Sequence, residues 1–333
     1  MSPSPRWRTW TLFLAPPAAF LLALLIGRYG VDPIEALHAL FGGSETPEIL
    51  RSLILRVRLP RALAAACIGA NLAVCGAALQ GLFRNPLVDA RILGVSSGAA
   101  FGAAFALLFS AGAAAVQGSA FVFALVAVAL VALVGWRFGA STLVIIIGGI
   151  LISALFNALI GLIKTVADPL SNLPAITYWL LGGLGGVRWA VLPPLLTITG
   201  LGLAFFLLVR WRLNLLTLSD AEAAALGIRI RALRIVVIVV ATVMVAASVA
   251  VGGMIGWIGL VVPHVARTWT GPDHRLLIPA AAAIGASTLI VLDTIARTAL
   301  PSEIPLGILT GLIGVPAFFV LFLRFLRARE EVR

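Results

Sequence analysis

The chain has 333 residues, of which 61% are hydrophobic and 11% are charged, and its mean hydropathy is +1.12. Soluble domains contain roughly 45–50% apolar and about 25% charged residues, so these proportions exclude a water-soluble fold. The formal net charge is +11, but the basic residues are scattered between apolar stretches and form no basic stripe, which argues against a nucleic-acid partner. We therefore expect one transmembrane domain that covers residues 1–333.

Ten apolar runs, bounded by charges, glycines and prolines, are predicted to cross the membrane. A span requires about 20 mostly apolar residues. The first run follows Arg6 and Arg8 like a secretory signal, but no small-residue cleavage site precedes Arg28, so we interpret it as the first span. The fold class is predicted to be an all-α integral membrane protein. The expected spans are residues 9–29, 60–82, 93–112, 118–136, 142–163, 190–209, 234–252, 255–269, 276–296 and 305–323.

Basic residues in the short connections orient these spans, because cytoplasmic loops carry an excess of lysine and arginine. If both termini are cytoplasmic, most of the arginines fall inside, among them Arg84, Arg137, Arg212, Arg275 and Arg329. The sequence therefore predicts a multi-pass protein of the bacterial cytoplasmic membrane whose two ends lie in the cytoplasm.

Three segments do not fit the pattern of simple spans. Residues 31–57 carry four acidic side chains and are expected to form an external amphipathic connection. Residues 170–187 combine a short apolar stretch with a glycine-rich turn, which is typical of a re-entrant or half helix packed against protein or water. Residues 213–227 include Asp220 and Glu222 between two arginine-flanked spans, and they predict a short helix on the cytoplasmic side.

A serine motif raises a rival class, the intramembrane serine hydrolase. Gly94-Val95-Ser96-Ser97-Gly98 matches the G-x-S-x-G pattern of nucleophile elbows. Such an elbow needs a strand-to-helix turn and a partnering histidine. Here the motif opens an apolar helix, and the histidines, His38, His264 and His274, lie outside the expected spans or toward the end of one. A helix start rich in serine and glycine that packs against another helix explains the motif better.

The sequence contains neither a phosphate loop of the G-x-x-x-x-G-K-[ST] type nor a cluster with metal-ligand spacing. We therefore expect no enzyme activity and no bound cofactor or metal in this chain. Acidic residues are nearly absent from the spans, which disfavours coupling to protons or sodium. Asp293 is the one candidate, and with Arg297 four residues later it is interpreted as half of a helix-end ion pair. The energy source is expected on another subunit.

A series of motifs resembles the FecCD family, the permease family of type II ABC importers for iron-siderophores, haem and cobalamin. The resemblance covers nearly the whole chain. In order, the motifs are Arg58-Leu59-Pro60-Arg61, then Gly76 and Gln80, Arg84-Asn85-Pro86-Leu87, Leu93-Gly94-Val95-Ser96-Ser97-Gly98-Ala99, Tyr178-Trp179-Leu180-Leu181-Gly182-Gly183, Gly256-Trp257-Ile258-Gly259-Leu260-Val261-Val262-Pro263-His264, Gly271-Pro272-Asp273-His274-Arg275 and Glu303-Ile304-Pro305-Leu306-Gly307.

The resemblance implies a homodimer of ten-helix subunits with the translocation path at the shared interface. Two cytoplasmic ATPase subunits would hold ATP and Mg, and a periplasmic binding protein would deliver the cargo. We expect an iron chelate, siderophore or haem; cobalamin is the next alternative and an oxyanion such as molybdate the least favoured. Two positions depart from the family pattern: Ala90-Arg91 stands where a proline is common, and Ser219 where a glycine is common.

The resemblance also assigns three groups of residues. For docking of the binding protein they are Arg58, Arg61 and Arg297; the alternative is that these arginines extend to the membrane interface as anchors. For the path and its gate they are Ser141, Thr142, Gln80, Asn85, Tyr178, Trp179 and Arg188; at Ser141 and Thr142 a simple helix N-cap is an equal alternative. In the predicted cytoplasmic coupling helix they are Asp220, Glu222, Ala223, Leu226 and Gly227.

Overall fold

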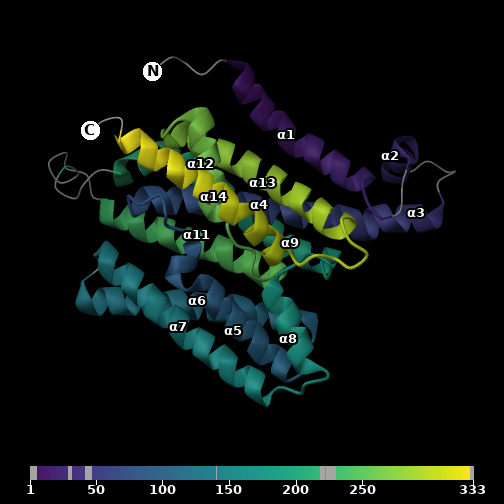
Figure 1. The fold of residues 1–333 in the computed structure, drawn as a ribbon, viewed down its shortest axis with the longest axis horizontal. Helices are drawn as coiled ribbons and strands as arrows, with labels where there is room; N and C mark the ends of the chain where they lie inside the picture. Colours follow the sequence, from purple (N-terminus) through teal and green to yellow (C-terminus); the bar gives the residue numbers. More distant parts are fainter. Residues whose placement is uncertain are drawn as a thin grey trace.

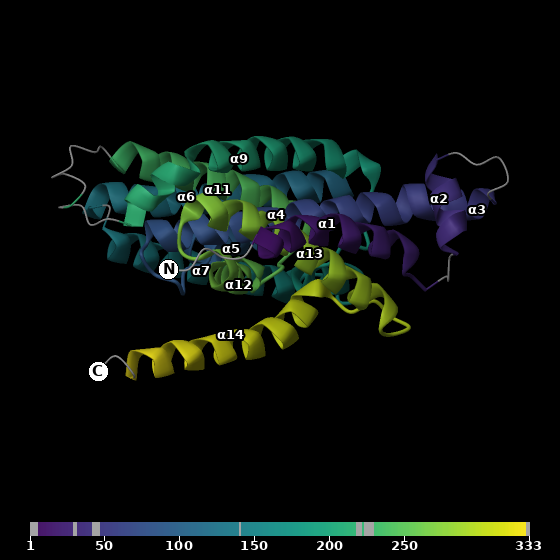
Figure 2. The same cartoon turned by 90° about the horizontal axis from the view of Figure 1, so that it is seen from above.

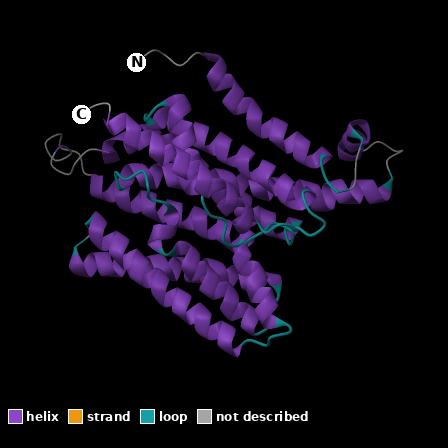
Figure 3. Ribbon diagram, viewed as in Figure 1, coloured by secondary structure: helices purple, strands orange, loops and turns teal. Residues whose placement is uncertain are grey.

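The computed structural model describes residues 6–28, 32–41, 47–139, 141–217, 222 and 230–330. Within these ranges every regular element is helical, and Figure 3 shows helices joined by short loops. The α-helices are α1 (Arg6–Leu25), α2 (Pro33–Phe41), α3 (Glu48–Ser52), α4 (Leu59–Leu82), α5 (Val95–Leu108), α6 (Ala113–Phe138), α7 (Thr142–Val166), α8 (Asn172–Leu181), α9 (Leu192–Leu213), α11 (Ile230–Gly252), α12 (Ile258–Thr270), α13 (His274–Thr298) and α14 (Leu306–Glu330).

Each of the ten expected spans coincides with a helix, so the all-α membrane fold is confirmed. Among the described residues, six helical stretches are long and apolar enough to cross a membrane alone. The helix α7, for example, has 25 residues, which at 1.5 Å each exceed the roughly 30 Å of hydrocarbon. Shorter apolar stretches lie in α1, α5 and α14, and α12 has 13 residues.

The helices lie roughly side by side and form a bundle with two ends (Figure 1). The start of α1, the end of α14, and the ends of α9 and α11 that flank residues 218–229 lie toward one end of the bundle. Helices α2 and α3 lie at the opposite end. The two described chain ends therefore face the same side.

Helix α4 forms the centre of the molecule. The most apolar window of the stretch Glu48–Leu82 is 89% buried, and α4 packs against α9, α11, α12 and α13. Glycines permit this close packing: a Cβ on Gly69 would lie 2.2 Å from the Gly285 carbonyl oxygen of α13, and one on Gly76 would lie 1.9 Å from that of Gly259 in α12. Small residues that let backbones touch are the usual device of membrane helices.

Helices α5, α6 and α7 form a second group beside this centre (Figure 1). Gly98 and Gly102 of α5 contact the backbone of Phe123 and Ser119 of α6, as the small-x-x-x-small spacing predicts. By contrast, α14 diverges from the other helices toward its C-terminus in Figure 2. Several side chains that follow Gly314, such as Val315 and Phe319, are exposed.

The expected external connection, residues 31–57, is more helical than predicted. It contains α2, α3 and a π-helical turn, Leu53–Arg58, that continues directly into α4. The resulting helix covers 35 residues, Glu48–Leu82. The expected span begins at Pro60, since prolines bound the apolar runs of the sequence; in the structure the π-helical turn continues the helix through this proline.

Candidate functional site

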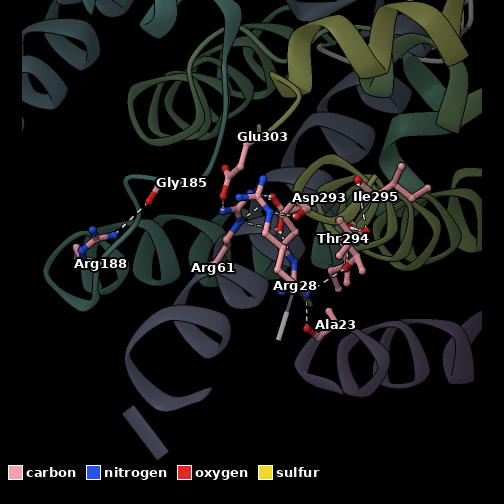
Figure 4. A network of polar contacts seen from close by, with 12 residues as sticks. Ala23, Arg28, Arg61, Gly185, Arg188, Asp293, Thr294, Ile295 and Glu303 are labelled. Carbon is pink, nitrogen blue, oxygen red and sulfur yellow. Dashed lines mark hydrogen bonds and ion pairs between the residues drawn. The ribbon is translucent and has the colours of Figure 1, made fainter. Parts of the chain in front are cut away.

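Arg61 is the centre of a buried polar network at the end of the bundle where α2 and α3 lie (Figure 4). Its Nε donates to both carboxylate oxygens of Asp293, at 3.0 and 2.9 Å, and its Nη2 lies 2.9 Å from Oδ1. Its Nη1 donates to Oε1 of Glu303 at 2.8 Å. Arg61 is 7% exposed and Asp293 3%. The guanidinium fork thus joins α4 to α13 and to the loop before α14, with the geometry that charge-assisted pairs favour.

Arg58 lies one helical turn earlier and binds a helix end. Its Nη1 donates to the carbonyl oxygens of Leu24 and Leu25, at 2.7 and 2.9 Å. The last carbonyls of a helix have no partner within it, so this side chain satisfies the C-terminus of α1. Arg58 is 4% exposed as a result.

Arg297 completes the connection between α13 and α1. Its Nη2 donates to the carbonyl oxygen of Ala23, and its Nε lies 3.9 Å from Asp293. In return, Arg28 donates to the carbonyl oxygens of Arg297 and Leu300, at 3.0 and 3.2 Å, beyond the end of α1. Arg58 and Arg297 therefore bind the C-terminal end of α1, and Arg28, just beyond α1, binds that of α13.

The three arginines expected to dock the binding protein thus gather in one place, and each binds partners within this chain. Their docking role stays a prediction. Arg188 differs: it is exposed, and among the described residues it donates only to the carbonyl oxygens of Gly185 and Val187 in its own loop, at 3.2 and 3.0 Å. Figure 4 shows Arg188 apart from the Arg61 cluster.

Asp293 was expected to pair with Arg297, and that pair is present at 3.9 Å. Its closer partner, Arg61, was missed, because 232 positions separate the two residues. One signal was available: an acidic residue inside a span requires a cation at a similar depth, and Arg61 near the start of its own span could have supplied it.

The predicted half helix is present as α8, and it ends in the glycine turn. Gly183 donates to the carbonyl oxygen of Gly252 at 2.8 Å, and Gly182 accepts from the amide of Leu306 at 2.9 Å. These bonds fix α8 against the end of α11 and the start of α14, which satisfies the irregular backbone. Of the two path candidates here, Tyr178 is 60% exposed, whereas Trp179 is half-buried and packs against the core.

The path candidates at the other end of α4 have structural partners. Gln80 is 3% exposed; it accepts from Nη1 of Arg267 at 2.6 Å and donates weakly to the Gly259 and Leu260 carbonyls at 3.4 Å. In this conformation it therefore faces α12 and not open space. The Oδ1 of Asn85 accepts from its own loop, from the Leu87 amide at 2.9 Å.

At the start of α7, Ser141 is the helix N-cap, because its Oγ accepts from the Val144 amide at 3.3 Å. The N-cap interpretation of Ser141 is thus confirmed, whereas the gate role of Thr142 stays a prediction. A second cap lies at the start of α13, where Asp273 accepts from the Arg275 amide at 2.9 Å and from Asn214 at 2.7 Å. These two bonds hold the pKa of Asp273 below its ordinary value.

Comparison with known proteins gives this site its context. The model of the FecCD transport family matches residues 14–324. The chain belongs to this family. It is 39% identical to the molybdate import system permease protein MolB of Haemophilus influenzae, over 92% of each chain. It is 37% identical to the hemin transport system permease protein HmuU of Yersinia pestis, over 92% of this chain and 94% of the relative.

A solved structure supports the same assignment. It is described as an inward-facing transporter of the metal-chelate ABC type, and it matches with a TM-score of 0.87 and 37% identity, over 95% of this chain and 98% of that one. This FecCD chain is accordingly a multi-pass membrane permease of the ABC transporter class.

Two further expectations concern the FecCD chain outside the network. In the predicted coupling helix, Glu222 is helical and exposed, while Asp220, Ala223, Leu226 and Gly227 lie outside the described residues. The serine motif follows the 3₁₀ turn Ala90–Leu93 and opens α5. It thus lacks the preceding strand that a nucleophile elbow requires.

Proposed function

We propose that this chain imports an iron chelate, a siderophore or haem, across the bacterial cytoplasmic membrane as the permease of an ABC importer. The observation that carries the proposal is the similarity, over nearly the full length, to a hemin permease and to a metal-chelate type transporter. An oxyanion is the second candidate because MolB, named for molybdate, is 39% identical to this chain, compared with 37% for the hemin permease. Cobalamin remains the alternative that the sequence motifs leave open.

The assembly that we propose contains two copies of this chain, two ATPase subunits with ATP and Mg, and a periplasmic binding protein. The permease holds no phosphate loop in its sequence, so the energy must enter from another subunit. Both termini and residues 213–227 face the cytoplasm, where the predicted coupling helix contacts the ATPase. Large cargo favours a path between two subunits, because rigid-body rocking then opens it without breaking either helical core.

In this proposal the translocation path runs beside the path candidates that are exposed or that lie near one end of the path. Tyr178 and Arg188 lie near the external end, where the Arg61 cluster holds α1, α4 and α13 together. Thr142 lies at the cytoplasmic start of α7. Docking by the binding protein would engage the surface around Arg58, Arg61 and Arg297, either directly or through exposed neighbours such as Arg188.

The deciding experiment is transport by the complete complex in proteoliposomes. The permease, its ATPase and its cognate binding protein are reconstituted, and ATP-dependent uptake is measured for hemin, ferric siderophores, molybdate and cobalamin. ATP-dependent accumulation of an iron chelate supports the proposal. Accumulation of molybdate or cobalamin alone would assign the alternative cargo. Permease without the ATPase should accumulate none of them and should hydrolyse no ATP.

A further inference from the structure

Arg91 forms a polar group beside the start of α12 that no role above includes. Its Nε donates to Oδ2 of Asp89 at 2.8 Å, and its amide donates to Oδ1 at 2.9 Å. Its guanidinium carbon lies 5.7 Å from the centre of the Trp257 ring, a cation–π distance. A Cβ on Gly256 would lie 2.8 Å from its Nη1. Asp89 and Trp257 therefore hold the guanidinium in one orientation.

The depth of this group follows from the helices around it. The carbonyl oxygen of Ile92 touches Gly149, which lies seven residues into α7, or about 10 Å from its start. Trp257 is the N-cap of α12, whose 13 residues span about 20 Å. The start of α7 and the end of α12 lie toward the same end of the bundle (Figure 1). Arg91 therefore lies inside a hydrocarbon layer of about 30 Å, about 10 to 20 Å from this end of the helices.

The side chain of Arg91 is nevertheless 43% exposed, whereas that of Asp89 is 12% exposed. A charge exposed to lipid at this depth is strongly unfavourable, so intramembrane ions face protein or a water-filled cavity. The exposed edge of Arg91 must then border an aqueous space. In a permease with so few charges in its spans, that space is the route of the cargo.

The hydrogen-bonding capacity of Arg91 is only partly used. Among the described residues, Asp89 occupies Nε, and no hydrogen bond engages Nη1 or Nη2. These two nitrogens form the fork that binds carboxylates and oxyanions in a bidentate manner. The carboxylate of Asp89 already balances the positive charge of Arg91. An anion therefore binds Arg91 weakly enough to be released, as passage along a path requires.

We propose that Arg91 is a specificity-determining residue of the translocation path, at which an anionic group of the cargo binds in passing. The inference rests on the proposed function and narrows its cargo to anions: a chelate that carries carboxylates or a net negative charge, or an oxyanion. Trp257 and Asp89 are positioning residues that hold the fork toward the path. The backbone at Trp257, in the left-handed region with a φ of 67°, fixes the ring beneath the guanidinium.

The test measures uptake by the full reconstituted complex with wild-type permease and with two variants, Arg91→Gln and Arg91→Lys. Uptake is measured separately for five compounds: hemin, an anionic ferric tris-catecholate, molybdate, a neutral ferric hydroxamate and cyanocobalamin. Arg91→Gln should lower uptake of the transported anion about tenfold, the effect of losing one charge-assisted hydrogen bond, and should spare or raise uptake of a neutral cargo. Arg91→Lys should recover part of the loss. The control is Arg137→Gln, because Arg137 is also exposed and stacked on an aromatic ring, 5.6 Å from Phe138, at the end of α6.

Each outcome has a distinct meaning. ATPase activity stimulated by the binding protein should stay unchanged in Arg91→Gln, which separates a path defect from misfolding or loss of coupling. Equal loss for anionic and neutral cargo, or unchanged anion uptake, would overturn the role of Arg91 and leave the permease function intact. A wild-type complex that moves only neutral cargo would do the same. Failure of the wild-type complex to move any of the five compounds would overturn the proposed function and the role of Arg91 with it.

Discussion

Arg58 closes the C-terminal end of the preceding span, because its Nη1 lies 2.7 Å from the carbonyl oxygen of Leu24. An arginine in this position can bind an acidic partner protein only if it leaves the helix end. The cap is buried, and an unpaired buried carbonyl is unfavourable. The arginines at this end of the bundle therefore fall into two classes, those that hold helices together and those that remain available at the surface.

Asp293→Asn should destabilise the protein without altering exposed charge. The change removes the carboxylate from a buried ion pair and leaves Glu303 as the one acidic partner of the Arg61 guanidinium. We expect the free energy of unfolding to fall by about 3 kcal/mol. The measurement is the thermal unfolding midpoint in detergent, followed by size-exclusion chromatography. Asp168→Asn is the matched control, because Asp168 is exposed and accepts hydrogen bonds that an asparagine oxygen can also accept. Equal midpoints for both variants would contradict the network's structural role.

Arg188→Glu should slow association with the binding protein, because charges at the rim of an interface mainly set the encounter rate. We expect a severalfold lower association rate and a weaker dependence on salt, with an unchanged unfolding midpoint. Surface plasmon resonance on permease in nanodiscs measures the association rate and its dependence on salt, and thermal unfolding in detergent measures the midpoint. Arg61→Glu should instead lower the midpoint, since it places a third carboxylate beside Asp293 and Glu303. Normal association by Arg188→Glu would exclude Arg188 from docking.

Gly69→Ala should disrupt the contact between α4 and α13. The new methyl group would lie 2.2 Å from a backbone oxygen of Gly285, and neither backbone can move without separating the helices. We expect the free energy of unfolding to fall by about 2 kcal/mol or more, as in overpacked cores. The measured signs are a lower thermal unfolding midpoint and a lower yield of protein extracted from the membrane. Gly200→Ala in α9 is the control, since no atom beyond its own stretch of helix lies within 4 Å of the added Cβ, and it should be neutral or stabilising.

Ala223→Arg should uncouple ATP hydrolysis from transport while the protein still inserts, because a long charged side chain prevents close docking of the predicted coupling helix. The measured quantity is cargo moved per ATP hydrolysed in proteoliposomes. Ala232→Arg, at an exposed position near the start of α11, serves as the control. If Ala223→Arg couples hydrolysis to transport as the wild type does, the ATPase must contact a different loop.

Thr142→Cys tests the gate at the start of α7. If this position narrows the path between two copies, oxidation should crosslink the dimer when the cytoplasmic side is closed. Ser141→Ala should remove only the cap bond to Val144, which destabilises by about 1 kcal/mol. The absence of a crosslink in every nucleotide state would leave this end of α7 with the cap as its sole function.

Local features of this chain were predictable because they depend on nearby residues. Apolar run length predicted where ten of the helices lie, the Ser141 cap follows from residue type beside a helix start, and the spacing of Gly98 and Gly102 predicted close packing. The partners of Arg61 and Gln80 could not be predicted in the same way. Asp293 and Arg267 lie 232 and 187 positions away, and only the folded arrangement of α4, α12 and α13 determines which polar groups meet.

The central position of α4 has a consequence for how the protein is made. Synthesis delivers this helix to the membrane early, yet its neighbours α11, α12 and α13 emerge more than a hundred residues later. Until then Arg61 lacks Asp293 and Asn71 lacks Ser248, and the nascent helix must stay at the insertion machinery or pair temporarily with lipid. Chains truncated before α13 would keep this exposed polar surface, a ready signal for membrane quality control.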